Sequence, residues 1–230
     1  YEMLRSLVGS EMCIRDRVRP ALELCKKKHI PVVVIDSEVS DTEAVVSTIV
    51  SDNYDAGVQC AKDMMKKKTS ANIIIVNQKA LNSINERVKG FRDTIKGHPQ
   101  YKIVEEKESA AEFEIAMKVM EKIIYEKKNY DVVMGGNDPI ALGCIAAMQM
   151  TDKTDQVMVY GVDGSPDGKA MIKAGFLEGT AAQSPIKIGE KAVQTAYSYL
   201  AGETVKKHVT IPVELITADN LKFYDMTGWQ

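Results

Sequence analysis

The sequence is poor in residues that build metal and redox sites, and this shortage excludes several kinds of protein. The four cysteines lie far apart in the chain: Cys13, Cys25, Cys60 and Cys144. No local metal knuckle or redox pair is expected from that spacing, and we predict that they are buried as small apolar side chains. The three histidines are as isolated: His29, His98 and His208. We assign them no metal or general-base role, and we expect no metal and no cofactor.

Long apolar runs and an excess of one charge are also missing. No apolar run approaches the roughly 18 to 20 residues that a membrane-spanning helix needs. Lys and Arg number 30 and Asp and Glu 32, for a net charge of -2. This balance offers no basic surface for nucleic acid or acidic lipid.

The common catalytic and phosphate-binding motifs are absent too. The sequence has no GxGxxG, GxxxxGK[ST], GxSxG or HExxH. Two carboxylates such as Asp36 and Asp163 could act as acid and base in glycoside hydrolysis, but binding of hydroxyl groups accounts for both as well. We therefore expect a protein that is not an enzyme.

The first 17 residues read YEMLRSLVGSEMCIRDR and have no features of a secretory signal. The string SLVGSEMCIRDR resembles translated sequencing-adapter read-through, so we expect residues 1–17 to be an artefactual leader and the protein to begin near Val18. The alternative is an amphipathic first helix, which Gly9 would weaken.

From Val18 onward, helical and strand-like patterns alternate. Helices are predicted at 19–28, 55–67, 85–96, 112–126, 139–150, 167–174 and 186–200. Strands are predicted at 32–35, 44–50, 72–76, 101–106, 131–134, 157–160, 179–183 and 209–216. The apolar run at 32–35 predicts a strand that is buried on both faces. This alternation is typical of a doubly wound α/β fold with parallel sheets.

Hydrogen-bonding side chains follow nearly every predicted strand. Ligands of such folds bind outside the carboxyl ends of the strands. Asp36, Asn137, Asp163 and Gln183 stand at or just after these ends, and Arg87 follows the loop at 77–85 after the strand at 72–76. One cation with carboxylates and amides suits a neutral polyhydroxyl ligand, because each sugar hydroxyl both donates and accepts hydrogen bonds. The alternative is that these are solvated loop residues and helix caps.

Six motifs in order resemble the ribose-binding type of periplasmic binding protein over about residues 18 to 230: IPVVVID (30–36), SDNYDAG (51–57), NERVKGF (85–91), GGNDPIALG (135–143), VYGVDGSPDG (159–168) and AAQSPIKIGEKA (181–192). The resemblance implies the two-lobed type I periplasmic-binding-protein fold. In this family two α/β lobes joined by three crossover segments close on a sugar by a hinge motion and deliver it to an ABC-type importer.

The resemblance also implies roles for single residues. Asp36 matches the aspartate that accepts sugar hydroxyls from the N-terminal lobe, and Arg87 matches the sugar-binding arginine of the C-terminal lobe. The remaining matched polar contacts are Asn137, Asp163 and Gln183. The residues matched to the crossovers, where we expect the hinge, are Asp52, Asn53, Ser184 and Thr217.

Two positions depart from the family pattern near the ligand. Ser37 stands where ribose binders have arginine, so one bidentate clamp is missing, and Ser37 is retained only as a possible ligand contact. Ala111 falls where an aromatic ring often stacks on the sugar. Phe113, two positions further on, is either a ligand contact or a core residue.

The family also has three strands with their helices before the part that corresponds to Val18, so we expect an incomplete N-terminal lobe with an open sheet edge. The expected organisation is a leader at 1–17, a remnant of the N-terminal lobe with crossovers at 18–53 and 185–216, a C-terminal lobe at 54–184, and the third crossover with the tail at 217–230. A two-lobed binding protein gains affinity from contacts that both lobes make with the sugar at once. Weak or no sugar binding is therefore expected of these 230 residues.

The favoured function is the substrate-binding component of an ABC-type carbohydrate importer. Its partners would be a monosaccharide or polyol and a membrane ABC permease, with no nucleic acid. It would be monomeric when complete and extracytoplasmic, in the periplasm or lipid-anchored at the cell surface. The alternatives are the effector-binding domain of a lac-repressor-like transcription regulator, which shares the fold, and the sugar-sensing ectodomain of a signalling receptor.

Overall fold

The computed structural model describes residues 18–151 and 157–230. The expected leader, its alternative helix and Cys13 lie outside the described residues. The described chain divides into two compact units. Unit 1 comprises residues up to Val50 together with Ile188–Thr210, and unit 2 comprises Ser51–Lys187 together with Ile211–Gln230. The chain therefore passes between the units at 50–51, 187–188 and 210–211.

Unit 2 is built on a six-stranded sheet with the order β4-β3-β5-β6-β7-β9. Its strands are β3 (Ala71–Asn77), β4 (Tyr101–Glu108), β5 (Val132–Gly135), β6 (Met158–Asp163), β7 (Gly179–Ala182) and β9 (Glu214–Thr217). The first five pair in parallel, and β9 pairs antiparallel to β7. The strand order reverses beside β3, where such folds place a ligand site.

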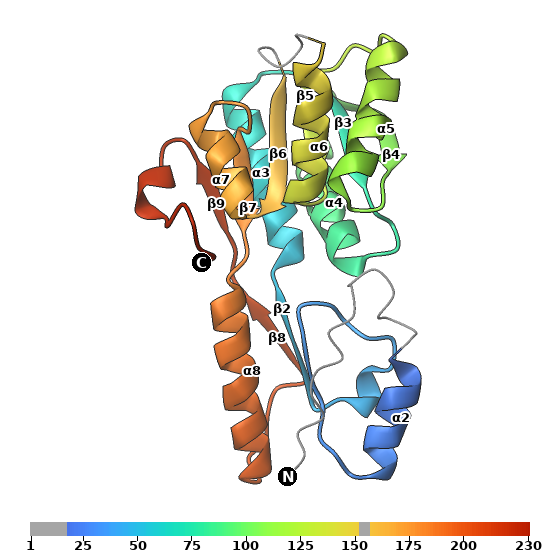
Figure 1. The fold of residues 1–230 in the computed structure, drawn as a ribbon, viewed down its shortest axis with the longest axis vertical. Coiled ribbons are helices and arrows are strands. Elements are labelled where there is room, and N and C mark those ends of the chain that lie inside the picture. Colours follow the sequence, from blue (N-terminus) through green and yellow to red (C-terminus); the bar gives the residue numbers. More distant parts are fainter. Residues whose placement is uncertain (1–17, 152–156) are drawn as a thin grey trace. The chain divides into compact units, whose positions relative to one another are not determined.

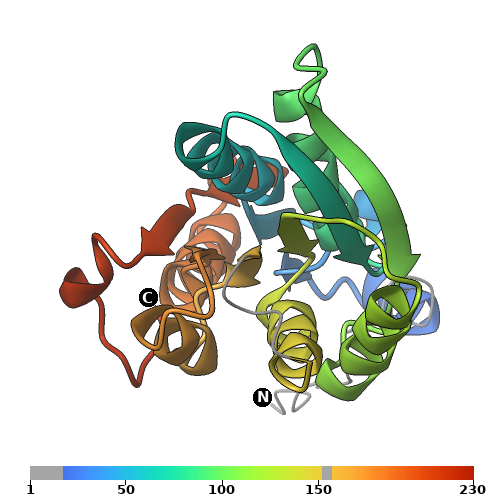
Figure 2. The same ribbon diagram turned by 90° about the horizontal axis from the view of Figure 1, so that it is seen from above.

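Helices cover both faces of this sheet (Figures 1 and 2). On one face lie α3 (Asn53–Lys67) and α4 (Asn82–Ile95), and on the other lie α5 (Phe113–Tyr125), α6 (Asp138–Gln149) and α7 (Pro166–Lys173). Covered on both faces, the central strands are continuous apolar runs, and Ile73 to Val76 in β3 are fully buried. The α/β fold with parallel sheets is confirmed.

The predicted last strand, 209–216, is wrong as a single element. The structure has two strands there, β8 (His208–Ile211) and β9, and they belong to different sheets. Pro212 lies between them, and it has no N–H to donate to a ladder. Helix α4 begins at Asn82, three positions before the predicted start at 85.

Unit 1 contains a three-stranded sheet with the order β1-β2-β8, formed by β1 (Val33–Ile35), β2 (Ser47–Ser51) and β8. Its helices are α2 (Arg19–Lys27) and α8 (Pro185–Leu200), which begins in unit 2. Leu22, Val39 and Val45 form a small core. The prediction that β1 is buried on both faces is wrong. Ile35 is 50% exposed, because β1 is an edge strand that pairs only with β2 among the described residues.

Candidate functional site in unit 2

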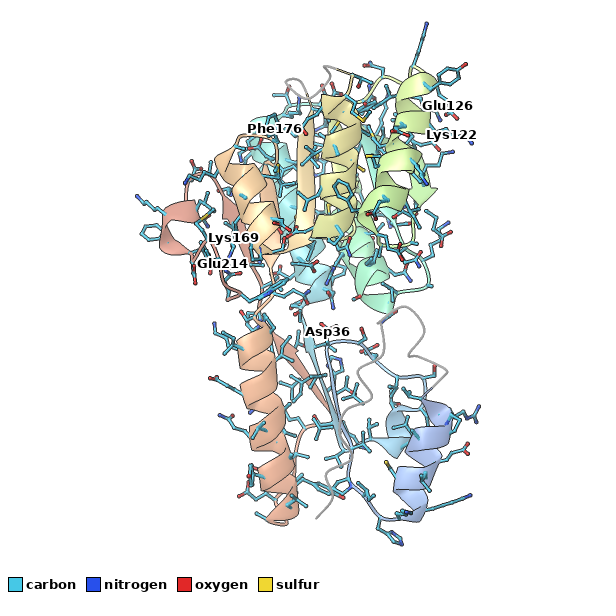
Figure 3. The ribbon with its side chains drawn as sticks, viewed as in Figure 1. Asp36, Lys122, Glu126, Lys169, Phe176 and Glu214 are labelled. Atoms are coloured by element: carbon cyan, nitrogen blue, oxygen red, sulfur yellow. The ribbon has the colours of Figure 1, made fainter. Side chains whose placement is uncertain are left out.

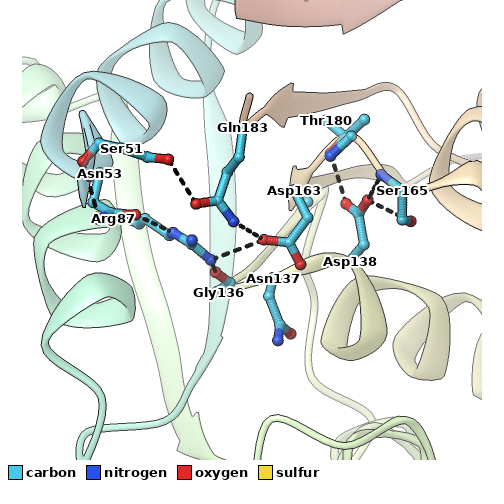
Figure 4. Close-up of polar contacts among 12 residues, drawn as sticks. Ser51, Asn53, Arg87, Gly136, Asn137, Asp138, Asp163, Ser165, Thr180 and Gln183 are labelled. Carbon is cyan, nitrogen blue, oxygen red and sulfur yellow. Dashed lines mark hydrogen bonds and ion pairs between the residues drawn. The ribbon is translucent and has the colours of Figure 1, made fainter. Parts of the chain in front are cut away.

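Three predicted site residues of unit 2 lie together where the parallel strands end. Arg87 lies in α4, the helix after β3, while Asp163 ends β6 and Gln183 follows β7. The carboxyl ends of parallel strands meet at one edge of a sheet, so residues far apart in the sequence converge there. The structure brings these three side chains into direct contact (Figure 4).

Arg87 carries a buried charge that its neighbours compensate. Its side chain is only 5% exposed. Nη1 donates to the carbonyl oxygen of Gly136 at 3.0 Å and to Oδ1 of Asp163 at 3.3 Å, and Nε donates to Oδ1 of Asn53 at 2.8 Å. A guanidinium stays protonated in proteins, so burial is tolerated only with such partners. Nη2 makes no hydrogen bond to any described residue.

The contacts close into a ring of five residues (Figure 4). Nε2 of Gln183 donates to Oδ1 of Asp163 at 2.8 Å, and Oγ of Ser51 donates to Oε1 of Gln183 at 2.8 Å. Nδ2 of Asn53 donates to the carbonyl oxygen of Ser51 at 3.2 Å, which returns the ring to Arg87. A connected network of hydrogen bonds of this kind holds its members in one arrangement.

Two glycines set the position of α4 and therefore of Arg87. A Cβ atom on Gly57 of α3 would lie 1.8 Å from the carbonyl oxygen of Arg87, and one on Gly90 would lie 2.0 Å from that of Tyr54. The backbones of α3 and α4 thus touch at both points. Neither position has room for a larger residue, because the nearest atoms belong to the backbone.

Asp163 is the carboxylate of the ring, and its pKa is shifted by burial and by neighbouring charges. Burial raises its pKa to about 7, the positive charge of Arg87 opposes the rise, and the negative charge of Asp138 adds to it. Asp163 also has a φ of 139°, a conformation that residues other than glycine seldom adopt. The side chain remains 17% exposed, so a ligand can reach it.

Asp138 supports this site and was not among the predicted ligand-binding residues. It is fully buried, and its Oδ2 accepts from the backbone N–H of Ser165 at 2.8 Å and from its hydroxyl at 2.7 Å. Oδ1 accepts from Oγ1 of Thr180 at 2.6 Å, and Thr180 in turn accepts from the N–H of Gly164 at 3.0 Å. Asp138 thereby holds the turn after Asp163. The signal was the second polar residue of the GGND motif.

Asn137 and Phe113 lie at the same carboxyl edge but outside the ring. Oδ1 of Asn137 accepts from the N–H of Ile140 at 3.0 Å and caps α6, and the side chain points away from the Arg87–Asp163 pair (Figure 4). Phe113 begins α5 and is 39% exposed, so it is not a core residue.

Asp36 and Ser37 belong to unit 1. Asp36 follows β1 (Figure 3) and has a φ of 67°. Its N–H donates to the carbonyl oxygen of Ile49 at 2.9 Å. Oγ of Ser37 donates to Oδ2 of Asp36 at 3.4 Å. Both residues are half-buried at the carboxyl end of their strand.

The residues expected at the hinge occupy different places. Asp52 caps α3 through Oδ1, which accepts from the N–H of Asp55 at 2.9 Å, and Asn53 is part of the ring. Both lie just after the first passage between units, and Ser184 lies just before the second. Thr217 ends β9 inside unit 2, further along the chain than the third passage at 210–211.

The described residues hold free thiols but no cluster of metal ligands. Within 18–151 and 157–230, no group of three His, Cys, Asp or Glu side chains could hold a metal ion, and no helix is long and apolar enough to cross a membrane. The prediction of buried cysteines is confirmed for Cys60 and Cys144, while Cys25 is half-buried. Burial raises the thiol pKa of Cys60 and Cys144, so both stay protonated.

The fold and the polar ring define a ligand-binding α/β protein whose site lies at the carboxyl ends of its strands. Residues 13–204 match the periplasmic binding protein domain family. The ribose import binding protein of Escherichia coli (strain K12) is 31% identical over 204 residues, which cover 87% of this chain and 68% of that protein. The D-apiose import binding protein of Paraburkholderia graminis is 31% identical over 222 residues, covering 95% and 69%.

A solved structure agrees with these relatives. An ABC transporter solute binding protein from Agrobacterium vitis with bound D-fucose is 30% identical, with a TM-score of 0.79 over 88% of this chain and 71% of that one. The chain belongs to the periplasmic binding protein family, and within it to the ribose-binding type of sugar-binding protein. This is a family of binding proteins.

Proposed function

We propose that the protein is the substrate-binding component of an ABC-type importer for a monosaccharide or a related polyol. The observation that carries the proposal is the Arg87–Asp163 pair with Gln183, a buried but accessible set of donors and acceptors at the carboxyl ends of parallel strands. The relatives are named for the import of ribose and D-apiose, which are polyhydroxyl compounds.

The chemistry of the pair suits sugar hydroxyls. Nη2 of Arg87 is left to donate to hydroxyl oxygens, and the carboxylate of Asp163 accepts from hydroxyl hydrogens. Asn137 can do both. Because the guanidinium is already oriented by Asn53 and Gly136, ligand binding need not order it, which lowers the entropic cost of binding.

The contribution of unit 1 is part of the same proposal. Asp36 accepts hydroxyl hydrogens from its strand end, with Ser37 beside it, and Phe113 of unit 2 offers its partly exposed ring to an apolar face of the sugar. The two units act as the two lobes, and the lobes close on the ligand. The segments at Asp52, Asn53 and Ser184 and the third passage at 210–211 absorb the backbone rotation.

The setting follows from the importer role. The protein works outside the cytoplasmic membrane, in the periplasm or anchored at the surface, as a monomer that passes its ligand to a membrane permease. It catalyses no reaction and needs no cofactor. The relatives, which are named as import binding proteins, favour this function over a lac-repressor-like regulator and over a signalling ectodomain.

Calorimetric titration tests the proposal. The product of the complete reading frame is titrated with D-ribose, D-apiose, D-fucose and myo-inositol, and with L-leucine as a ligand that lacks hydroxyls. We expect saturable binding of at least one sugar or polyol and none of L-leucine. Binding of the amino acid alone, or of no polyhydroxyl compound, would refute the assignment.

A further inference from the structure

Lys169 is a buried cation that the binding site does not use. It lies in α7 (Figure 3), and it is fully excluded from solvent. Burial of an ammonium group is costly unless hydrogen bonds replace its water, and burial lowers the pKa of Lys169. The residues that accept hydrogen bonds from this ammonium group therefore show which segment of the chain Lys169 fixes in place.

Among the described residues, the hydrogen-bond acceptors of the Lys169 ammonium group all lie within residues 225–230. Nζ donates to the backbone carbonyl oxygens of Asp225 and, at 2.6 Å, of Gly228. With its amide oriented so that both groups have partners, Gln230 accepts from Nζ at 2.8 Å. Asp225 also orders this segment, because its Oδ1 accepts from the N–H and the hydroxyl of Thr227, both at 2.9 Å.

The same segment reaches the turn that carries Asp163. In that orientation, the amide nitrogen of Gln230 donates to the carbonyl oxygen of Gly164 at 3.3 Å. The opposite side of the turn is held by Thr180, whose Oγ1 accepts from the N–H of Gly164. Asp163 has a φ of 139°, which residues other than glycine seldom adopt, and the hydrogen bonds on both sides of Gly164 stabilise this turn.

We propose that Lys169 is a positioning residue that fixes residues 225–230 against the turn at Asp163–Ser165 and thereby sets the position of the Asp163 carboxylate for the ligand. The consequence for affinity rests on the proposed sugar-binding function; the role of Lys169 in the turn does not. If residues 225–230 moved away from α7, the buried ammonium group of Lys169 would lose its hydrogen-bond acceptors, which is energetically costly. This cost keeps the segment in place.

Amide hydrogen exchange tests the positioning directly. Lys169→Met keeps the length and apolar stem of the side chain but removes the three donors. Lys173→Met, an exposed lysine of the same helix, is the matched control. We expect faster exchange at 163–165 and 225–230 in Lys169→Met, with β3 and β5 unchanged and the control like the wild type. Unchanged exchange at 163–165, or equal acceleration throughout unit 2, would overturn the proposal.

Gln230→Ala separates the contact between Gln230 and Gly164 from the contacts between Lys169 and the backbone of Asp225 and Gly228. It removes the link to Gly164 and leaves the two carbonyl contacts of Lys169 intact. We expect faster exchange at Gly164 while Asp225 to Gly228 stay protected. This variant also keeps the proposal testable if Lys169→Met fails to fold, and protection of Gly164 equal to that of the wild type would overturn it.

Ligand affinity gives the functional arm in the product of the complete reading frame. Lys169→Met and deletion of residues 225–230 should each raise the Kd of the bound sugar about tenfold, the effect of losing one well-placed hydrogen bond. Combining them should add nothing further, because both act on one turn. Wild-type affinity in either variant, or additive losses, would contradict the proposal. If the wild type binds no sugar, the proposed function fails, and hydrogen exchange still decides the role of Lys169.

Discussion

Nη1 of Arg87 and Oδ1 of Asp163 lie 3.3 Å apart, with side chains that are 5% and 17% exposed. The arginine is buried because three oxygen atoms replace its water, and the aspartate remains the more accessible partner. The guanidinium of Arg87 orients the carboxylate of Asp163 through this contact. The Asp163 side chain remains partly exposed, so it can still accept a hydrogen bond from a ligand.

Replacing Arg87 should weaken ligand binding strongly. Arg87→Ala removes charged hydrogen bonds and leaves Asp163 without its cation, so we expect a loss of about 1.5 to 3 kcal/mol of binding free energy, or roughly 10- to 150-fold in Kd. Arg92→Ala is the control, because Arg92 lies in the same helix and pairs with Glu106 near the surface. Calorimetric titration of both variants checks the prediction, and an unchanged Kd in Arg87→Ala would remove this residue from the site.

The raised pKa of Asp163 predicts a pH dependence of stability. Between the ordinary value of 3.8 and about 7, the folded protein holds a proton that the unfolded chain has released. The contribution of this group to the free energy of unfolding therefore falls as the pH rises through that range and is constant above it.

Asp163→Asn isolates this contribution, because the amide cannot titrate but can accept the same two hydrogen bonds. Urea unfolding of the wild type and the variant from pH 4.5 to 8 measures the difference. We expect the wild type to lose stability relative to Asp163→Asn as the pH rises toward 7. A difference that is independent of pH would contradict the raised pKa.

The close contact between α3 and α4 predicts that a glycine substitution there destabilises the protein, whereas a glycine substitution on the open surface of α8 does not. Gly90→Ala places a methyl group against the backbone of Tyr54 and pushes α4 away, so we expect lower stability and weaker ligand binding. Gly189→Ala in α8 meets no atom within 4 Å and should stabilise its helix by about 0.5 to 1 kcal/mol. Urea unfolding of each variant is the measurement. Equal effects would show that the contact does not position α4.

The core of the fold could be predicted because its strands are short apolar runs between amphipathic helices. The run at 72–76 became the fully covered β3. Prediction failed where pairing partners decide the outcome. Residues 209–216 read as one strand, yet the halves on either side of Pro212 pair with different sheets. The composition of β1 is that of a strand buried on both faces, yet Ile35 is 50% exposed.

The site could be predicted in part for a similar reason. Asp163 and Gln183 were found because they follow strands, and Arg87 because its motif resembles a family. Ser51 was not selected, since its bond to Gln183 spans 132 residues of sequence and depends on the order of the strands. Asp138 was passed over for its neighbour, because sequence does not show which of two adjacent polar residues turns inward.

The central claim is that the Arg87–Asp163 pair binds sugar hydroxyls, and the most direct measurement follows the Nε–H signal of Arg87 by ¹H–¹⁵N NMR while sugar is added. Arg87→Lys, which lacks this group, assigns the signal in the product of the complete reading frame. We predict that the sugar bound in the calorimetric titration shifts the signal saturably, with the same Kd, and that L-leucine leaves it in place. Saturable sugar binding that leaves the Arg87 signal unmoved would contradict this account.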